Sequence, residues 1–467
     1  MKAGLFIAGL EYLLIASTLS LHHRATSNTE TGLIDALSNA ATNASGFDQN
    51  TSAALSGIAS QLKQIMSMGA AAPDSTQSAL STIQKHFANG EPSNIVDAAH
   101  AIAFSGLIPA DILSFLDGYF DSDLNSPRSQ NPASNQTIFP SKATGDAPYS
   151  IPEDKLRAAI YIPDSFSYGQ NGKIPVILVP GTAVPAGTTY YYNFGKLGNN
   201  SPADVVWVNL PRASLSDAQD NAEYVAYAIN YISALCAGQN VAVISWSQGG
   251  LDTQWALKYW PSTRTVVKDF VAISPDFHGT VVEAVICPAL TFVACTPSIW
   301  QQGLEAEFIK VLHDNGGDSA YVPTTTVYSS FDEIVEPMSG KNASAILADA
   351  RGVGVTNAHL QTVCAGQPAG GVYTHEGVLY NALAWALAID AITHEGPADL
   401  SRLGLAHVCQ QVIPSTLDLE DLLGTEGLLL VVVAELLSYQ PLATSEPPLK
   451  AYTTDENKPD NRKRFIS

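Results

Sequence analysis

Residues 241–250 read Val241-Ala-Val-Ile-Ser-Trp-Ser-Gln-Gly-Gly250. The first part is apolar and β-branched, which is typical of a buried strand, and a helical pattern begins directly after the second serine. A sharp strand-to-helix turn presents a serine hydroxyl clear of its neighbours, and it needs small residues two positions before and after that serine. Ser245 and Gly249 occupy these positions around Ser247. We interpret the stretch as a nucleophile elbow; the alternative is an ordinary strand-to-helix connection with a capping serine.

Short β-branched runs follow one another through the second half of the chain. The expected strands are Ile174–Val179, Val205–Asn209, Val241–Ser245, Phe270–Ser274 and Thr324–Tyr328. Helical patterns such as Ser216–Leu235 and Gly249–Trp260 lie between most of them. This order predicts an α/β fold with a mostly parallel central sheet and helices on both faces.

The chain has 467 residues, enough for one large α/β domain and an appendage. We predict a helical N-terminal extension over residues 22–120, a linker rich in Pro, Ser, Asn and Asp over 121–146, and the α/β domain over 147–467. The extension could be a cleaved pro-region, a cover over an apolar entrance or a passive appendage.

Residues 1–21 predict a secretory signal, because Met1-Lys2 is followed by the mostly apolar Ala3–Leu21. Glu11 interrupts this run, which is barely long enough to span a membrane, so a short membrane anchor is the weaker alternative. Five Asn-x-Ser/Thr sequons are compatible with secretion and glycosylation, namely Asn43, Asn50, Asn135, Asn199 and Asn342. We predict a secreted glycoprotein without a transmembrane span.

Composition and motifs argue against several classes of partner and cofactor. Charged residues make up only 14% of the chain and the net charge is −21, which argues against a nucleic-acid partner, since phosphates are bound by basic patches. The sequence contains no zinc-type Cys/His cluster, phosphate loop or dinucleotide fingerprint. We therefore predict no metal and no cofactor, and we expect a monomer.

The five cysteines also bear on whether the protein is secreted into an oxidising compartment. Cys236 lies in an amphipathic helical pattern and is predicted to be a buried free thiol. That leaves Cys287 with Cys295 and Cys364 with Cys409 as the predicted disulfides of a secreted protein. Other pairings are possible on the residues alone.

A hydrolase with this elbow needs an acid and a histidine, in the chain order Ser, Asp or Glu, His. Asp332 follows an expected strand, where a carboxylate can orient an imidazole, and His375 lies further along the chain. Val179-Pro-Gly-Thr182 ends another strand in a tight turn, which would bring backbone N–H groups near the elbow as part of an oxyanion hole. Each residue alone has an ordinary structural explanation, but their joint order favours a serine hydrolase.

Several motifs agree with one known family. They are Val179-Pro-Gly-Thr182, Ser245-Trp-Ser-Gln-Gly-Gly250, Ser274-Pro-Asp-Phe-His-Gly-Thr-Val281, Ser298-Ile-Trp-Gln-Gln302 and Tyr328-Ser-Ser-Phe-Asp-Glu-Ile-Val335. Together they resemble the fungal lipase B family of the α/β-hydrolase superfamily, and the resemblance runs from about residue 174 to residue 409. That family also has a small hydroxyl residue two positions before the nucleophile, so Ser245 fits its pattern.

The resemblance implies Ser247 as nucleophile, Asp332 as orienting acid and His375 as base. It implies an oxyanion hole formed by Thr182 and Gln248, with Thr182 contributing its hydroxyl as well. Water would then release the acid from an acyl-enzyme on the serine.

The resemblance also implies residues of the substrate pocket. Trp246 would line the small pocket beside the nucleophile, and Asp276 would lie on the acyl side. Val282–Pro297 corresponds to a mobile helix beside the family's entrance, and a bridge between its two cysteines would restrain it. The apolar run Gly427–Ala434 lies where the family has an apolar helix beside the entrance; core packing is the alternative.

The tetrapeptide Thr-His-Glu-Gly occurs twice, at Thr374–Gly377 and Thr393–Gly396. We choose His375 as the base because it lies inside the loop closed by the expected Cys364–Cys409 bridge, as the family arrangement implies. His394 follows a helical pattern that favours a surface position.

We therefore predict a secreted hydrolase of carboxylic esters that acts on lipids, including esters at an oil–water interface. Another enzyme of the same chemistry, a non-lipase carboxylesterase or a transacylase, is the first alternative. A catalytically silent secreted binding protein of the same fold is the second.

Overall fold

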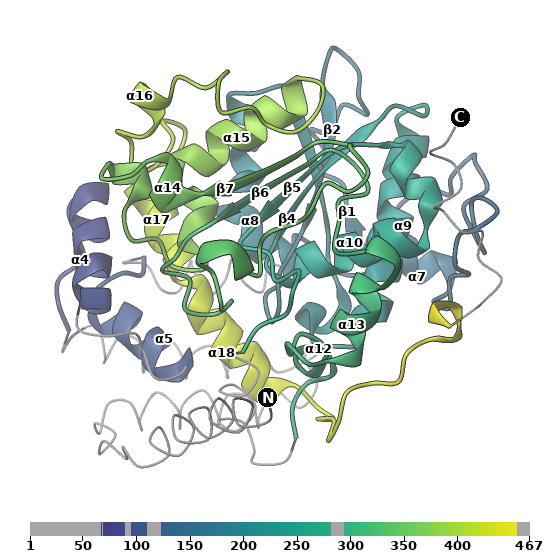
Figure 1. Ribbon diagram of the computed structural model, residues 1–467, viewed down its shortest axis with the longest axis horizontal. Helices are drawn as coiled ribbons and strands as arrows, with labels where there is room; N and C mark the ends of the chain where they lie inside the picture. The colour runs from purple at the N-terminus through teal and green to yellow at the C-terminus, as the bar shows by residue number, and fades with distance from the viewer. Residues whose placement is uncertain (1–66, 68, 89–94, 110–122, 282–293, 455–467) are drawn as a thin grey trace, which may run out of the picture.

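The structure, a computed structural model, describes residues 67, 69–88, 95–109, 123–281 and 294–454 (Figure 1). A seven-stranded sheet crosses its centre in the order β1-β3-β2-β4-β5-β6-β7. The strands are β1 (Ile160–Tyr161), β2 (Ile174–Val179), β3 (Ala203–Val208), β4 (Val241–Trp246), β5 (Val267–Ile273), β6 (Thr324–Tyr328) and β7 (Val355–His359). Every neighbouring pair is parallel except β1 with β3. The predicted α/β class with a mostly parallel sheet is confirmed.

Helices cover both faces of this sheet. They are α4 (Thr76–Ala88), α5 (Ile95–Phe104), α7 (Glu153–Ala158), α8 (Ala186–Tyr191), α9 (Ala218–Leu235), α10 (Gln248–Tyr259), α12 (Pro297–Gln301), α13 (Glu307–His313), α14 (Leu360–Val363), α15 (Ala382–Thr393), α16 (Leu405–Val408), α17 (Leu419–Glu426) and α18 (Leu428–Ser438). Successive strand residues point to opposite faces, so Leu178 joins one apolar core and Val179 the other. Helices α9, α10 and α13 pack on the second core, whereas α15, α17 and α18 pack on the first.

Side-chain caps fix the starts of several helices. The Asp217 carboxylate accepts a hydrogen bond from the Gln219 N–H (2.8 Å) at the start of α9. At the start of α17, Asp418 and Asp421 form a reciprocal capping box. Such caps satisfy N–H groups that have no partner within the helix, and they set where each helix begins.

The expected and observed strands differ most at the two edges of the sheet. Strands β2 and β6 have the predicted bounds, whereas β1 and β7 were not expected. Strand β7 reads Val-Thr-Asn-Ala-His and only Ala358 in it is buried. An edge strand is held by backbone hydrogen bonds to one neighbour and can remain polar, so it lacks the apolar signal by which buried strands are found.

The described part of the N-terminal extension packs on the α/β fold. Helix α5 lies against α18, and α4 contacts α17 (Figure 1). Apolar side chains such as Leu80 and Ile102 belong to the same core as one face of the sheet. Most of the extension, the predicted leader, Asn43 and Asn50 lie outside the described residues.

The stretch expected to be a linker, 121–146, is described from residue 123 onward, and it is held tightly there. The Leu124 carbonyl accepts hydrogen bonds from Trp207 Nε1 and Asn209 Nδ2, both at 2.8 Å. The Tyr231 hydroxyl donates to the Pro132 carbonyl (2.6 Å). These bonds make residues 123–146 an outer layer of the α/β domain instead of a free tether.

Among the described residues, no helix combines the length and apolar character needed to cross a membrane.

Candidate active site

Ser247 occupies the turn between β4 and α10. Its backbone has φ 55° and ψ −133°, which is a rare conformation for a residue with a side chain. The turn is held because the Ser247 N–H donates to the Ile273 carbonyl of β5 (3.0 Å). The side chain consequently stands at the carboxyl end of the parallel strands, where ligands bind in folds of this type.

Small residues make this turn possible. A Cβ on Gly249 would lie 2.5 Å from the Val179 carbonyl oxygen and 2.6 Å from that of Pro180, so α10 approaches the end of β2 too closely for a side chain. Ser245, two residues before the nucleophile position, is fully buried. The close approach expected around an elbow is therefore present, with glycine on the helix side and serine on the strand side.

Asp332 and His375 form a buried pair beside the elbow. The distance between Asp332 Oδ2 and His375 Nδ1 is 2.8 Å, and both side chains are almost inaccessible to solvent. The other carboxyl oxygen of Asp332 accepts hydrogen bonds from the N–H groups of Ile334 (3.0 Å) and Val335 (2.7 Å). The loop after β6 therefore fixes the carboxylate, and the carboxylate orients the imidazole.

Trp246 fixes His375 from the other side. The indole packs against the imidazole with ring centroids 4.9 Å apart, and its Nε1 donates to the His375 carbonyl (3.2 Å). The Ser274 hydroxyl donates to the same carbonyl (3.2 Å). Trp246 lines the same pocket as Ser247, and it also holds the loop that carries the histidine.

Ser247 and His375 line one pocket. Among the described residues no hydrogen bond joins the Ser247 hydroxyl to the imidazole, a contact that in hydrolases commonly shortens only when substrate is bound. The pocket is lined by Ile95, Thr182, Trp246, Ser247, Thr280, Ile299, Gln302, Ile334, Val335, His375, Glu376, Leu429, Val432 and Leu436. Most of these side chains are apolar, so the pocket suits a hydrocarbon chain or ring.

The apolar helix α18 and the N-terminal helix α5 both contribute to this wall. Leu429, Val432 and Leu436 of α18 line the pocket, while other residues of the helix pack in the core. The run Gly427–Ala434 therefore both packs in the core and lines the pocket, the two roles considered for it. Ile95 of α5 brings the extension to the pocket.

Thr182 and Gln248, the expected oxyanion-hole residues, are in contact. The Thr182 hydroxyl lies 2.7 Å from Gln248 Oε1 and 3.1 Å from Gln302 Oε1. Gln302 Nε2 in turn donates to Gln248 Oε1 (3.0 Å). The hydroxyl proton is thus directed to the glutamines in the absence of substrate, and it would have to turn toward a bound oxyanion.

Gln302 was not assigned a role from the sequence. It lies at the end of the motif Ser298-Ile-Trp-Gln-Gln302, and only the fold brings it from α12 to the elbow. Its place in the motif Ser298-Ile-Trp-Gln-Gln302 was the available signal for it.

Asp276 does not line the described pocket. It is fully buried, and neither of its carboxyl oxygens has a hydrogen-bond partner. Burial raises the pKa of Asp276 to about 7, with a smaller contribution from Asp332. Asp276 lies within the protein and interacts with another buried acid, Asp252; its place on the acyl side stays a prediction.

Three further carboxyl groups form a cluster near His375 and were not expected. Glu333 accepts a hydrogen bond from the His375 N–H (3.1 Å), and Glu426 accepts one from the Tyr380 hydroxyl (2.6 Å). Glu376 directly follows the histidine. Burial and mutual repulsion raise the pKa of Glu333 and Glu376 well above the ordinary value, and burial raises that of Glu426 to about 7. Their separation in the sequence hides this cluster.

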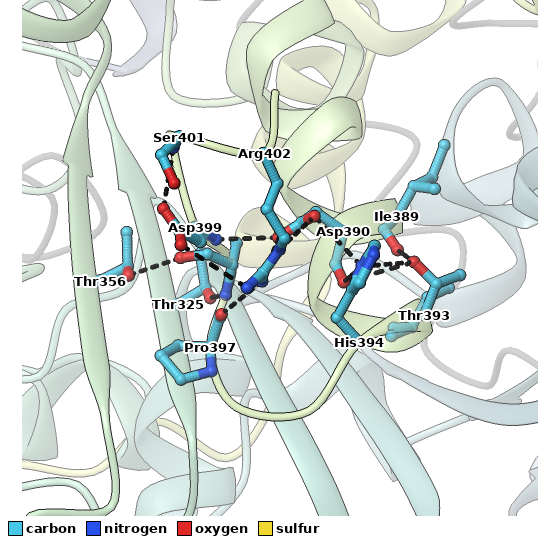
Figure 2. Close-up of polar contacts among 12 residues, drawn as sticks. Thr325, Thr356, Ile389, Asp390, Thr393, His394, Pro397, Asp399, Ser401 and Arg402 are labelled. Carbon is cyan, nitrogen blue, oxygen red and sulfur yellow. Dashed lines mark hydrogen bonds and ion pairs between the residues drawn. The ribbon is translucent and has the colours of Figure 1, made fainter. Parts of the chain in front are cut away.

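The second Thr-His-Glu-Gly tetrapeptide lies elsewhere. Figure 2 shows His394 at the end of α15, where its Nδ1 lies 3.2 Å from Asp390 Oδ1. Arg402 Nε donates to the same carboxylate (2.9 Å), so Asp390 anchors the following loop. The His394 side chain is half exposed and does not line the pocket. His375, not His394, is the histidine beside Ser247.

The cysteines agree with the predicted pairing where they are described. Cys364 and Cys409 form a disulfide with their Cα atoms 5.2 Å apart, and Cys236 is free and buried. Cys295 is also disulfide-bonded, and its predicted partner Cys287 lies outside the described residues. The described residues contain no group of three or more His, Cys, Asp or Glu side chains that could hold a metal ion.

Comparison with known proteins places this geometry in a family. No protein-family model matches the chain. Lipase B from Pseudozyma antarctica is 30% identical over 281 residues, which cover 60% of this chain and 78% of that protein. The crystal structure of Aspergillus fumigatus lipase B is similar with a TM-score of 0.83 and 61% identity, over 90% of this chain and 99% of that one.

A serine at a strand-to-helix elbow, with a parallel sheet beneath it and an Asp–His pair beside it, defines an α/β-hydrolase. The chain belongs to the lipase B family. It is a carboxylic ester hydrolase of the lipase and esterase kind, as the sequence predicted.

Proposed function

We propose that the protein hydrolyses lipid esters through an acyl-enzyme on Ser247. His375 takes the proton of the serine hydroxyl as its oxygen attacks the ester carbonyl, and Asp332 holds the imidazole in the required orientation. The proton then passes from the imidazole to the leaving alcohol. Water attacks the acyl-enzyme in the second half of the reaction and regenerates the serine. The observation that carries this proposal is the 2.8 Å Asp332–His375 contact beside Ser247 in an apolar pocket.

The developing negative charge on the carbonyl oxygen would be stabilised by N–H groups at the elbow. The first N–H groups of α10, including that of Gln248, have no partner within the helix and carry the positive end of its dipole. Thr182 would add its own N–H and, after turning away from the glutamines, its hydroxyl. Fixed donors of this kind are typically worth about 3 kcal/mol each in the transition state.

Covalent labelling tests the nucleophile. An alkyl fluorophosphonate should add one phosphonyl group to the peptide that contains Ser247, as read by mass spectrometry, and should abolish ester hydrolysis. Ser247→Ala should neither label nor hydrolyse p-nitrophenyl octanoate, with a loss of roughly 10⁴- to 10⁶-fold in rate. Labelling of another residue, or retention of more than a few per cent of activity in Ser247→Ala, would show that the reaction uses another nucleophile.

We further propose that the protein is a secreted, glycosylated monomer. The asparagines of the three described sequons, Asn135, Asn199 and Asn342, are exposed and therefore accessible to glycosylation. The Cys364–Cys409 disulfide fits an oxidising compartment. Treatment of protein from the culture medium with an N-glycosidase should reduce its mass, and sedimentation should give the mass of one chain.

The N-terminal extension is proposed to cover the pocket entrance. This rests on Ile95 in the pocket wall and on the packing of α5 against α18, whose residues line the same pocket. All residues assigned to the chemistry lie after residue 173, so the extension would control access and not the reaction itself.

A further inference from the structure

Glu376 is a polar residue of the pocket that has no role in the reaction described above. Thr280 and Gln302, which also line the pocket, are bonded within the protein: the Thr280 hydroxyl donates to the Ile334 carbonyl and Gln302 Nε2 to the Ser298 carbonyl, both at 3.0 Å. Glu376 is different, because its Oε1 is buried without a hydrogen-bond partner. Glu376 is therefore a pocket residue with unused hydrogen-bonding capacity and no part in the proposed reaction.

Glu376 contributes to the wall of the pocket that contains Ser247. It directly follows His375, lines the same pocket and is only 1% exposed. A buried polar atom without a partner typically costs about 1–3 kcal/mol, and such atoms in native proteins call for an explanation. A ligand group that bonds to Glu376 would remove this cost when the pocket is filled.

The acidic residues around Glu376 determine which chemical group of a ligand can bind to it. Burial, together with the nearby carboxyl groups of Glu333 and Glu426, raises the pKa of Glu376 well above the ordinary value. A protonated carboxyl group offers one O–H donor and an accepting oxygen. A hydroxyl group can both donate and accept, so it matches this pair. An anion would be repelled by Asp332 and by whichever cluster members are charged.

We propose that Glu376 is a specificity-determining residue that binds a hydroxyl group of the substrate. Leu429, Val432 and Leu436 form an apolar wall of the same pocket, so a hydroxyl there has few other partners. The hydroxyl could belong to the alcohol part, as in a partial glyceride, or to the acyl chain, as in a hydroxy fatty acid. The inference rests on the proposed reaction at Ser247, but it concerns the choice between substrates and not the chemical step.

Matched substrate pairs test the proposal. Propyl octanoate and 1-monooctanoylglycerol share the acyl chain and differ in two hydroxyl groups on the alcohol. Ethyl octanoate and its chain-hydroxylated analogue make the same comparison on the acyl side. We expect kcat/KM to favour the hydroxylated member of one pair by about three- to tenfold, the value of one hydrogen bond. Glu376→Met should bring that ratio close to one, whereas Glu376→Gln, which still donates and accepts, should keep most of it.

Glu426→Gln is the matched control, because it removes a carboxyl group of the same cluster that does not line the pocket. The preference should persist in this variant. An unchanged ratio in Glu376→Met, or no preference in the native enzyme for either pair, would overturn the proposal. If Glu376→Met does not fold, Glu376→Ala is measured in its place. Failure of the proposed function would be seen separately, as hydrolysis of both members by Ser247→Ala.

Discussion

At the scale of single residues, the geometry of the site depends on how firmly the ring and backbone of His375 are held. Its ring is bonded to Asp332 on one side and packed by Trp246 on the other, while its backbone carbonyl accepts two further hydrogen bonds. His394 lies in an identical tetrapeptide but is half exposed at a helix end. The difference between the two histidines lies entirely in their surroundings.

We predict that His375→Ala loses activity about as completely as Ser247→Ala, by roughly 10⁴-fold or more. His394→Ala should keep activity within about twofold, because its half-exposed side chain is hydrogen-bonded to Asp390 and Thr393 at the end of α15 and does not line the pocket. Both variants are assayed on p-nitrophenyl octanoate at the same pH, with circular dichroism as the control for folding. The reverse pattern would move the base to His394.

Asp269, which lies away from the active site, should make the stability of the protein depend on pH. Both of its carboxyl oxygens are buried without partners, and burial raises its pKa from 3.8 to about 7. Between these values the folded state binds a proton that the unfolded state lacks, so stability falls as the pH rises toward 7 and then levels off. Asp269→Asn removes this dependence.

The stability of Asp269→Asn relative to the native protein should therefore increase by about 3 kcal/mol between pH 5 and pH 8. Urea unfolding at several pH values measures it. Asp164→Asn, at an exposed position, controls for the loss of one negative charge. A difference that is the same at every pH would mean that Asp269 ionises normally in the folded protein.

At the scale of elements, the close crossing of β2 and α10 sets the position of Ser247, the proposed nucleophile. The crossing is possible because residue 249 has no side chain, and a Cβ there would collide with the backbone of Val179 and Pro180. The strain of the Ser247 backbone is retained because the parallel strands and α10 hold both sides of the turn.

Gly249→Ala should destabilise the protein by roughly 1–3 kcal/mol and lower kcat, since the backbone of β2 or α10 must shift to accept the methyl group. Gly404→Ala is the matched control: a Cβ there meets no atom within 4 Å, and its φ is −73°. Thermal unfolding and initial rates on a short ester give the two readouts. Native stability and kcat in Gly249→Ala would show that the elbow is looser than its contacts indicate.

At the scale of the whole molecule, two apolar cores lie on opposite faces of one sheet, and the described residues of the N-terminal extension join the one beside the pocket. Residues 123–146 belong to the outer layer of the α/β domain through bonds such as Trp207 Nε1 to the Leu124 carbonyl. We therefore propose that the catalytic domain begins before residue 147 and includes residues 123–146.

We predict that a chain beginning at Asp123 hydrolyses short soluble esters and acts faster than the full chain on bulky triglycerides, because the cover contributed by α5 is gone. Removal also uncovers apolar surface on α18, so aggregation is monitored by light scattering. A chain beginning at Ala147 should be less stable, as it also loses the bonds of residues 123–146.

Soluble, folded protein that begins at Asp123 and hydrolyses no ester would assign the extension a part in the active site. Equal rates on triglycerides with and without the extension would show that it does not limit access.

The sequence by itself determined the elements that repeat a strong local pattern and the residues that stand in a motif. Strands β2 and β6 were expected with their observed bounds, because buried parallel strands are continuous apolar or β-branched runs. Ser247 could be identified because an elbow requires small residues at fixed spacing. The order Ser247, Asp332, His375 is likewise a property of the chain.

Only the tertiary structure decided the contacts between residues that are distant in the sequence and lack a motif. It brought Gln302 to Thr182, gathered three glutamates near His375, and left Asp276 inside the protein. It also brought Ile95 to the pocket and packed residues 123–146 onto the domain. Local patterns reflect burial and backbone conformation, whereas these positions follow from how separate segments pack, which no stretch of sequence encodes alone.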